Sequence, residues 1–126
     1  MTAGPFSVYR DAGAWLAQNA RGEGRILDLT DWSLYFSQRE GYRFAQVYEA
    51  PADRRTRWVV IRKPHLSGHW NYSRVVRELV RDRAPVAMVP EHPLPGQLQV
   101  LIYDLLSRPS RAGFPSEPEA SATAAR

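Results

Sequence analysis

The stretch Trp-Val-Val-Ile at residues 58–61 carries the strongest strand signal of the chain. Its apolar residues are continuous rather than alternating, as is typical of a strand that helices cover on both faces. After it, residues 64–71 predict a loop. Apolar residues then recur with helical spacing at positions 72, 75, 76, 79 and 80, and predict a helix that begins near Tyr72; one interpretation of the segment before it makes Asn71 the helix cap. A buried strand followed by an amphipathic helix is the repeating unit of an α/β fold.

The flanking segments extend this alternation of helices and strands. Upstream, the pattern predicts a helix over 11–19 with Asp11 as N-cap, a strand over 25–30, a helix over 32–38 and a strand over 44–48. Downstream, residues 86–89 and 98–105 predict an antiparallel hairpin, because the link at 92–96 is short. We therefore expect one small α/β domain over residues 1–106, with a partly parallel sheet flanked by short helices and a C-terminal antiparallel hairpin. Residues 107–126 are rich in Pro, Ser and Ala and predict a disordered tail.

Composition excludes several classes of protein. The chain has 126 residues, of which 44% are apolar and 24% charged, which is typical of a globular domain. It has no cysteine, so disulfides, thiol catalysis and cysteine-ligated metal centres are excluded. No apolar stretch approaches the roughly 20 residues of a membrane helix. No cleavable signal is recognisable, so a cytoplasmic location is the default expectation.

The positive charge is almost entirely arginine. Lys plus Arg number 17 against 13 acidic residues, giving a net charge of +4, and Lys63 is the single lysine. A nucleic-acid-binding protein concentrates its cations on one face. Here they are scattered and interleaved with acids, a pattern that a GC-rich genome also produces. We therefore do not expect nucleic acid as a partner.

Two carboxylates and an indole follow the first predicted strand, at Asp28, Asp31 and Trp32. Ligand sites of open α/β sheets lie at the carboxyl ends of parallel strands. Asp31 and Trp32 are therefore candidate ligand-binding residues. The structural alternative is that Asp31 caps the following helix while Asp28 accepts hydrogen bonds from the main chain or an arginine. The high frequency of Asp at N-caps favours that alternative.

The segment over residues 65–72 is the most distinctive of the chain, because it gathers imidazole, indole and phenol side chains between the best strand and the best helix. Its candidate ligand-binding residues are His65, His69, Trp70 and Tyr72. Aromatic faces bind sugars or bases, and helix N-termini attract anions. The sequence thus predicts a phosphate or carbohydrate contact. The structural alternative is that Trp70 and Tyr72 anchor the loop to the core.

Catalytic and cofactor motifs are not recognisable. His65 and His69 are four apart, but Pro64 and Gly68 disfavour a shared helix and no third ligand is evident, so no metal site is expected. The Gly-Glu-Gly run at 22–24 precedes a strand, whereas a dinucleotide-binding loop follows one. There is no nucleophile elbow and no catalytic triad. We expect no cofactor, and an enzyme acting on its own is not favoured.

Three runs, AWLAQN at 14–19, RILD at 25–28 and WSLYFS at 32–37, resemble the soluble C-terminal region of bacterial multi-spanning membrane glycosyltransferases. These enzymes are similar to dolichyl-phosphate-mannose protein mannosyltransferases and to the aminoarabinose transferases that modify lipid A. The segments at 57–61, 65–68 and 100–105 fit the same arrangement, so the resemblance spans about residues 8–106. It implies a small α/β domain located outside the cytoplasm.

The resemblance also implies where catalysis does not occur. In that family the catalytic carboxylate and the lipid-phosphate site belong to loops of the membrane portion, so no catalytic residue carries over to this sequence. Two hypotheses follow. One is a noncatalytic domain that contacts a glycan, an acceptor or a membrane glycosyltransferase. The other is a free-standing cytoplasmic module that binds a nucleotide or another anionic small molecule.

Overall fold

The computed structural model describes residues 5–20 and 24–107. Its helices and strands are, in chain order, α1 (Pro5–Asn19), β1 (Arg25–Asp28), α2 (Trp32–Ser37), β2 (Gly41–Arg43), β3 (Thr56–Ile61), α3 (Lys63–Ser67), α4 (Asn71–Leu79), β4 (Ala87–Val89) and β5 (Val100–Asp104). Two short 3-10 helices, η1 (Phe44–Gln46) and η2 (Ala50–Ala52), connect β2 to β3. None of the helices in the described ranges is long and apolar enough to cross a membrane.

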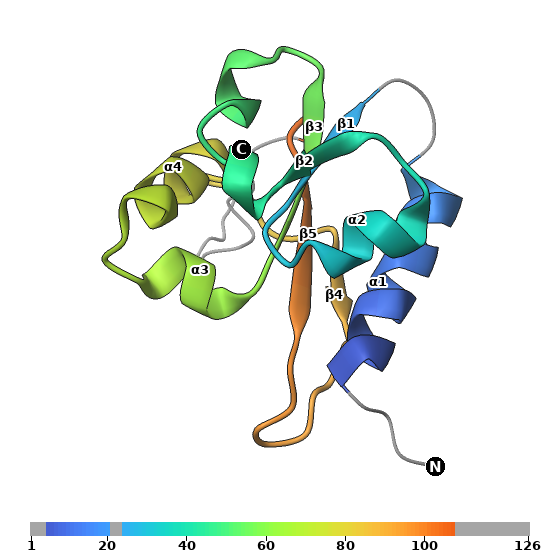
Figure 1. The fold of residues 1–126 in the computed structure, drawn as a ribbon. Helices are drawn as coiled ribbons and strands as arrows, with labels where there is room; N and C mark the ends of the chain where they lie inside the picture. The colour runs from blue at the N-terminus through green and yellow to red at the C-terminus, as the bar shows by residue number, and fades with distance from the viewer. Residues whose placement is uncertain (1–4, 21–23, 108–126) are drawn as a thin grey trace, which may run out of the picture.

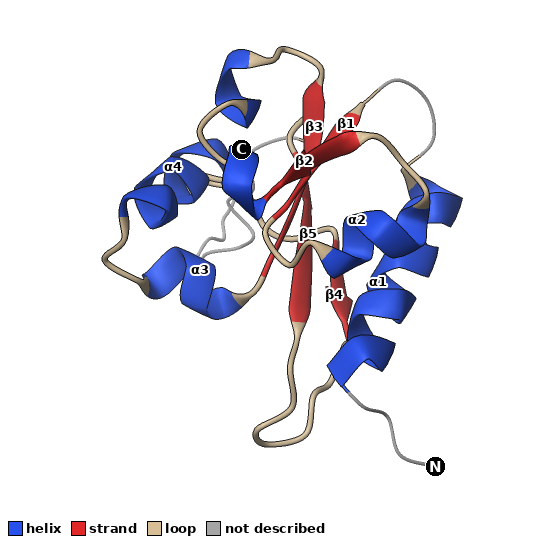
Figure 2. Cartoon of the chain, viewed as in Figure 1, coloured by secondary structure: helices blue, strands red, loops and turns tan. Residues whose placement is uncertain are grey.

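The strands form one five-stranded sheet in the order β2-β1-β3-β5-β4. Strands β2, β1 and β3 run parallel, while β5 pairs antiparallel with both β3 and β4. Helices α1 and α2 lie on one side of this sheet, and α3 and α4 on the other (Figures 1 and 2). The predicted fold class, a partly parallel sheet flanked by helices with an antiparallel C-terminal pair of strands, is confirmed.

The position of β3 at the centre of the sheet explains why its apolar run is continuous. Trp58 and Val60 belong to the core cluster that packs against α1 and α2, whereas Val59 and Ile61 belong to the cluster that packs against α4. All four side chains are buried. Successive side chains of a strand point to opposite faces, so a strand covered on both sides must be apolar at every position. The sheet thus separates two hydrophobic cores of similar composition.

Helix α1 begins earlier than the sequence pattern predicts. Asp11 is exposed in the middle of the helix, so its predicted role as N-cap is wrong. The buried residues Val8, Tyr9, Ala12 and Leu16 recur with helical spacing, and they bring the preceding turns onto the core. Packing of this apolar face, rather than a capping side chain, extends the helix toward the N-terminus.

The second parallel strand is displaced from its predicted position. Residues 44–48, predicted as a strand, instead begin with η1, and β2 lies just before them at Gly41–Arg43. Gly41 pairs with Ile26, and a Cβ atom at Gly41 would lie 2.0 Å from the carbonyl oxygen of Ile26. Gly41 therefore begins the strand because it permits this close approach of two backbones, and does not simply end the preceding helix.

The segment between β3 and α4 contains a helix where the sequence predicts a loop. Residues 63–67 form α3, and α4 begins at Asn71 with Trp70 in the N-cap position, so the prediction of Asn71 as cap is wrong. Arg77 of α4 fastens the two helices together, because its Nη1 donates hydrogen bonds to the carbonyl oxygens of Leu66 (2.6 Å) and Gly68 (2.9 Å). The end of α3 is thereby satisfied by a side chain from the next helix.

The C-terminal strands pair as predicted, although the link between them is longer than expected. Strands β4 and β5 are antiparallel, and the whole stretch 90–99 connects them. This stretch folds back toward the beginning of α3, where it forms one wall of a pocket. Most of the predicted tail, residues 108–126, lies outside the described residues.

Candidate functional site

The topology defines a switch point at the carboxyl edge of the parallel strands. From β1 the chain passes through α2 on one face to reach β2. It returns to β3 through η1 and η2, and Val47 and Ala50 of this connection lie in the other core. Ligands of open α/β sheets bind where such connections diverge. Residues 28–34 follow β1 and residues 62–72 follow β3, so every predicted site residue lies in the connections at this edge.

The turn after β1 is organised around the buried carboxylate of Asp28. Oδ1 accepts hydrogen bonds from the backbone N–H of Thr30 (2.8 Å) and from its hydroxyl (2.6 Å). Oδ2 accepts the backbone N–H of Leu34 (2.6 Å), which is one of the free donors in the first turn of α2. Asp28 has no exposed surface. This carboxylate therefore holds the end of β1 to the beginning of α2.

Burial dominates the electrostatics of this group. Desolvation raises the pKa of the Asp28 carboxyl from 3.8 to about 6, because it outweighs the three hydrogen bonds that favour the charged form. The carboxyl is enclosed by its own turn, so it faces no solvent-accessible cavity. Its role is to stabilise the turn, in agreement with the structural alternative considered for Asp28.

Asp31 does not cap α2 with its side chain. It occupies the position before the helix with a left-handed backbone conformation (φ 66°) and makes no capping hydrogen bond. Its Oδ1 instead accepts the backbone N–H of Phe44 at 2.7 Å, which joins the turn after β1 to the residue after β2. The predicted capping role is thus wrong, and Asp28 together with Thr30 takes it over. Asp31 itself is exposed at the edge.

Trp32 belongs to a separate aromatic group on α2. It is 43% exposed, and its ring lies 6.2 Å from that of Tyr35 and 6.4 Å from that of Phe36. The structure therefore divides the first predicted pair, since the Asp31 carboxylate bonds toward β2 whereas the Trp32 ring packs along α2.

The residues after β3 form an aromatic surface with Phe44. The ring of Tyr72 lies 4.7 Å from Phe44 and 6.1 Å from His65, and Trp70 stacks on Tyr72 at 5.5 Å with an interplanar angle of 11°. Trp70 nevertheless remains 56% exposed. We call Phe44, His65, His69, Trp70 and Tyr72 the α3–α4 aromatic surface. Its inner rings pack together, as the structural alternative predicts for Tyr72, while Trp70 presents its indole to solvent.

His65 is one of the inner rings of this surface and contacts Tyr72. Its Nδ1 accepts the backbone N–H of Arg62 at 2.9 Å, which places the proton of the neutral ring on Nε2. Burial and the positive charge of Arg62 lower the pKa of His65 from 6.5 to about 4, against the opposing effect of Asp31. The ring is therefore neutral at pH 7 and serves as a packing and hydrogen-bonding group.

His69 lies beyond the end of α3, exposed to solvent, so the two imidazoles do not share a helix face. Within residues 5–20 and 24–107, no group of three or more His, Asp or Glu side chains is placed to hold a metal ion.

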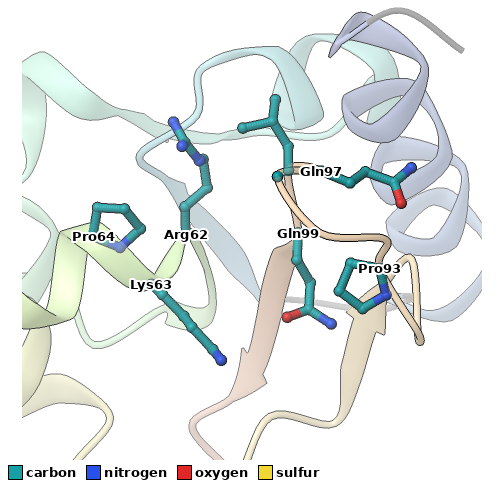
Figure 3. Close-up of a pocket in the computed structure, with 8 residues that line it drawn as sticks. Arg62, Lys63, Pro64, Pro93, Gln97 and Gln99 are labelled. Carbon is teal, nitrogen blue, oxygen red and sulfur yellow. The ribbon is translucent and has the colours of Figure 1, made fainter.

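A pocket of about 330 Å³ opens beside the aromatic surface, between the beginning of α3 and the 90–99 link (Figure 3). Its walls include Arg62, Lys63, Pro64, Pro93, Gln97 and Gln99. Arg62 and Lys63 directly follow β3 at the carboxyl edge of the parallel strands, whereas the opposite wall comes from the link before β5, so the pocket lies on the β5 side of β3. A volume of this size is at the lower end of the range for small-molecule sites.

Comparisons of the sequence with family models and with curated proteins, and of the structure with solved structures, found no match.

The pocket is the part of the site that sequence reasoning missed. Arg62, Lys63 and Gln99 were not among the candidate residues, because the strand order that brings them together is not visible in the sequence. The position of Arg62 and Lys63 immediately after the strongest strand was the available signal. Phe44 was missed for a different reason: its segment was predicted to be a strand.

Proposed function

We propose that this chain is a noncatalytic ligand-binding domain, similar to the soluble C-terminal region of bacterial membrane glycosyltransferases, and that it contacts a glycan through the α3–α4 aromatic surface. The observation that carries the proposal is Trp70, an indole that is 56% exposed and yet held parallel to a packed tyrosine ring. Flat aromatic rings with a polar edge suit the alternating apolar and polar faces of a sugar.

The surroundings of Trp70 favour binding with little reorganisation. Tyr72 supports the indole, and Phe44 and His65 support Tyr72 in turn. A ring that is already positioned loses less conformational freedom on binding than a freely rotating one. The exposed His69 and Asn71 flank the indole in sequence and supply polar groups for sugar hydroxyls.

The titratable groups at this edge favour binding over chemistry. The Asp28 carboxyl is enclosed by three donors, and the imidazole of His65 is packed between rings with its Nδ1 already bonded to the main chain. A general acid or base needs a free path to the substrate proton. The Asp28 carboxyl has no such path, and Nδ1 of His65 is already engaged by the main chain, which favours binding over acid–base chemistry at these two groups.

The proposal is tested by NMR titration of the ¹⁵N-labelled domain with mannotriose, cellotriose and chitotriose. We expect at least one of them to shift the amide signals of residues 65–72 and the indole signal of Trp70. The double variant Trp70→Ala, His69→Ala should keep the remaining spectrum and lose these shifts. Tyr48→Ala is the matched control, because Tyr48 is 59% exposed but lies outside the surface. Shifts that persist in the double variant, or the absence of shifts with all three sugars, would overturn the proposal.

A further inference from the structure

The pocket beside α3 has an unbalanced charge. Arg62 and Lys63 line it, and no lining residue is acidic. Some arginines of the described residues are neutralised by carboxylates, as Arg57 is by Asp104 at 2.9 Å and Arg55 by Asp53 at 3.1 Å. Among the described residues, neither Arg62 nor Lys63 has such an ion-pair partner. Two unneutralised cations around one concavity produce a positive potential that attracts anions.

The opposite wall supplies a fixed amide. Gln99 donates from Nε2 to the carbonyl oxygen of Pro90 at 2.9 Å, and this bond orients the side chain. Figure 3 shows the oxygen of Gln99 on the side of Lys63, while the side chain of Arg62 points away from that of Lys63. The amide oxygen can accept a hydrogen bond only from a donor such as a hydroxyl, whereas the Lys63 ammonium donates to an anionic or hydroxyl oxygen.

We propose that this pocket binds a small polyhydroxylated anion, a sugar phosphate or a sugar acid, with Lys63 Nζ on the anionic group and Gln99 Oε1 accepting from a hydroxyl. The volume of about 330 Å³ suits a ligand of monosaccharide size. Pro64 and Pro93 supply rigid apolar walls on either side. This inference goes beyond the proposed glycan contact, because it depends on residues outside the α3–α4 aromatic surface.

Lys63 provides its own probe, because it is the single lysine of the chain. Reductive ¹³C-methylation keeps its charge and gives one side-chain signal that NMR follows. We expect glucose 6-phosphate and glucuronate to shift this signal saturably below about 10 mM, a weak-site concentration. Neutral glucose should leave the signal unchanged, and inorganic phosphate should bind more weakly than glucose 6-phosphate. No saturable shift with either sugar anion would overturn the proposal, and equal binding of inorganic phosphate would overturn the hydroxyl contact.

A charge-matched pair of variants completes the test. Lys63→Gln should weaken binding of glucose 6-phosphate by about tenfold or more, measured by calorimetry, because a charge-assisted hydrogen bond is lost. Arg74→Gln removes the same charge from an exposed position of α4 and should change the affinity by less than about twofold. Equal losses in both variants would mean that only net charge matters, and would overturn the site.

The glycan contact and the anion pocket can be tested independently of each other. Neutral trisaccharides titrated into Lys63→Gln should still shift the signal of Trp70 if the glycan contact is correct. Saturable anion binding that survives in the Trp70→Ala, His69→Ala variant supports the pocket even where the aromatic surface binds no sugar.

Discussion

The connections after β1 and after β3 lie at the same edge of the sheet, yet they use their polar and aromatic side chains in opposite ways. After β1, the carboxylate of Asp28 is fully buried and all its bonds go to its own turn. After β3, Trp70 is 56% exposed and Lys63 has no acidic partner among the described residues. The switch-point rule locates both connections equally well. Burial and hydrogen bonding decide which of them is free to bind a ligand.

The largest expected effect follows from removing the buried carboxylate after β1. Asp28→Ala removes the acceptor for Thr30 and Leu34 and leaves buried donors unpaired, so we expect the free energy of unfolding at pH 7 to fall by about 3 kcal/mol. Asp28→Asn keeps one acceptor oxygen and should lose about half as much. Urea denaturation measures both.

Asp31→Asn is the matched control for that experiment. Asp31 is exposed, its carboxylate accepts the backbone N–H of Phe44, and Asn tolerates the same left-handed backbone conformation. We expect a change below about 0.5 kcal/mol. An Asp31 variant as unstable as the Asp28 variant would show that the two carboxylates share the structural role.

The next effect is on the pH dependence of stability, to which Asp28 and His65 contribute with opposite sign. The pKa of Asp28 is raised to about 6, so the folded state holds this proton more tightly and stability falls as pH rises from about 4 to 6. The shift corresponds to about 3 kcal/mol. The pKa of His65 is lowered to about 4, so the folded state holds that proton less tightly and stability rises over the same range.

Single substitutions separate these slopes. In His65→Asn, where the amide oxygen can still accept from Arg62, unfolding free energy should decrease from pH 4 to 6. In Asp28→Asn it should increase, and the wild-type protein should lie between the two. Denaturation curves at half-unit pH intervals provide the measurement. If the unfolding free energy changed with pH in the same direction in both variants, the opposite pKa shifts of Asp28 and His65 would be contradicted.

A substitution at Gly68 is expected to have a local effect, smaller than those at Asp28 and His65. A Cβ atom there would lie 2.0 Å from the ring of Trp70, so Gly68→Ala must displace the indole. Trp70 is exposed and the backbone of Gly68 is compatible with alanine (φ −74°), so stability should change by less than about 1 kcal/mol. The indole NMR signal of Trp70 should nevertheless shift as the stack on Tyr72 is lost. An unchanged signal would mean that the ring is not held by this stack.

The fold was predictable to the extent that burial leaves a pattern in the sequence. The apolar run of β3 and the helical spacing of α4 revealed the two-sided sheet, because each covered face requires apolar residues at a fixed period. Strand β2 was misplaced because its position depends on Gly41 meeting the backbone of Ile26, a contact between distant residues. Helix α3 was missed because five residues are too few for a periodic signal.

The location of the candidate site could be predicted from the sequence, but not all of the residues that form it. The aromatic residues between β3 and α4 were recognisable from their types alone, and in the structure His65 and Trp70 both contact the ring of Tyr72, which also packs against Phe44. Asp31 was assigned a capping role that its left-handed backbone conformation does not support. The wall of the pocket formed by Gln97 and Gln99 belongs to the link before β5, whereas Gln99 was predicted to lie in the strand over 98–105, so no local pattern connected it to Lys63.

The short outer strands limit how copies of this domain can associate edge to edge. Strands β2 and β4, which form the two edges of the sheet, have three residues each, and Pro85 and Pro90 stand close to either end of β4. A second chain that aligned with either edge would gain few main-chain hydrogen bonds before its register ended. Polymerisation of the domain through strand addition at either edge is therefore disfavoured.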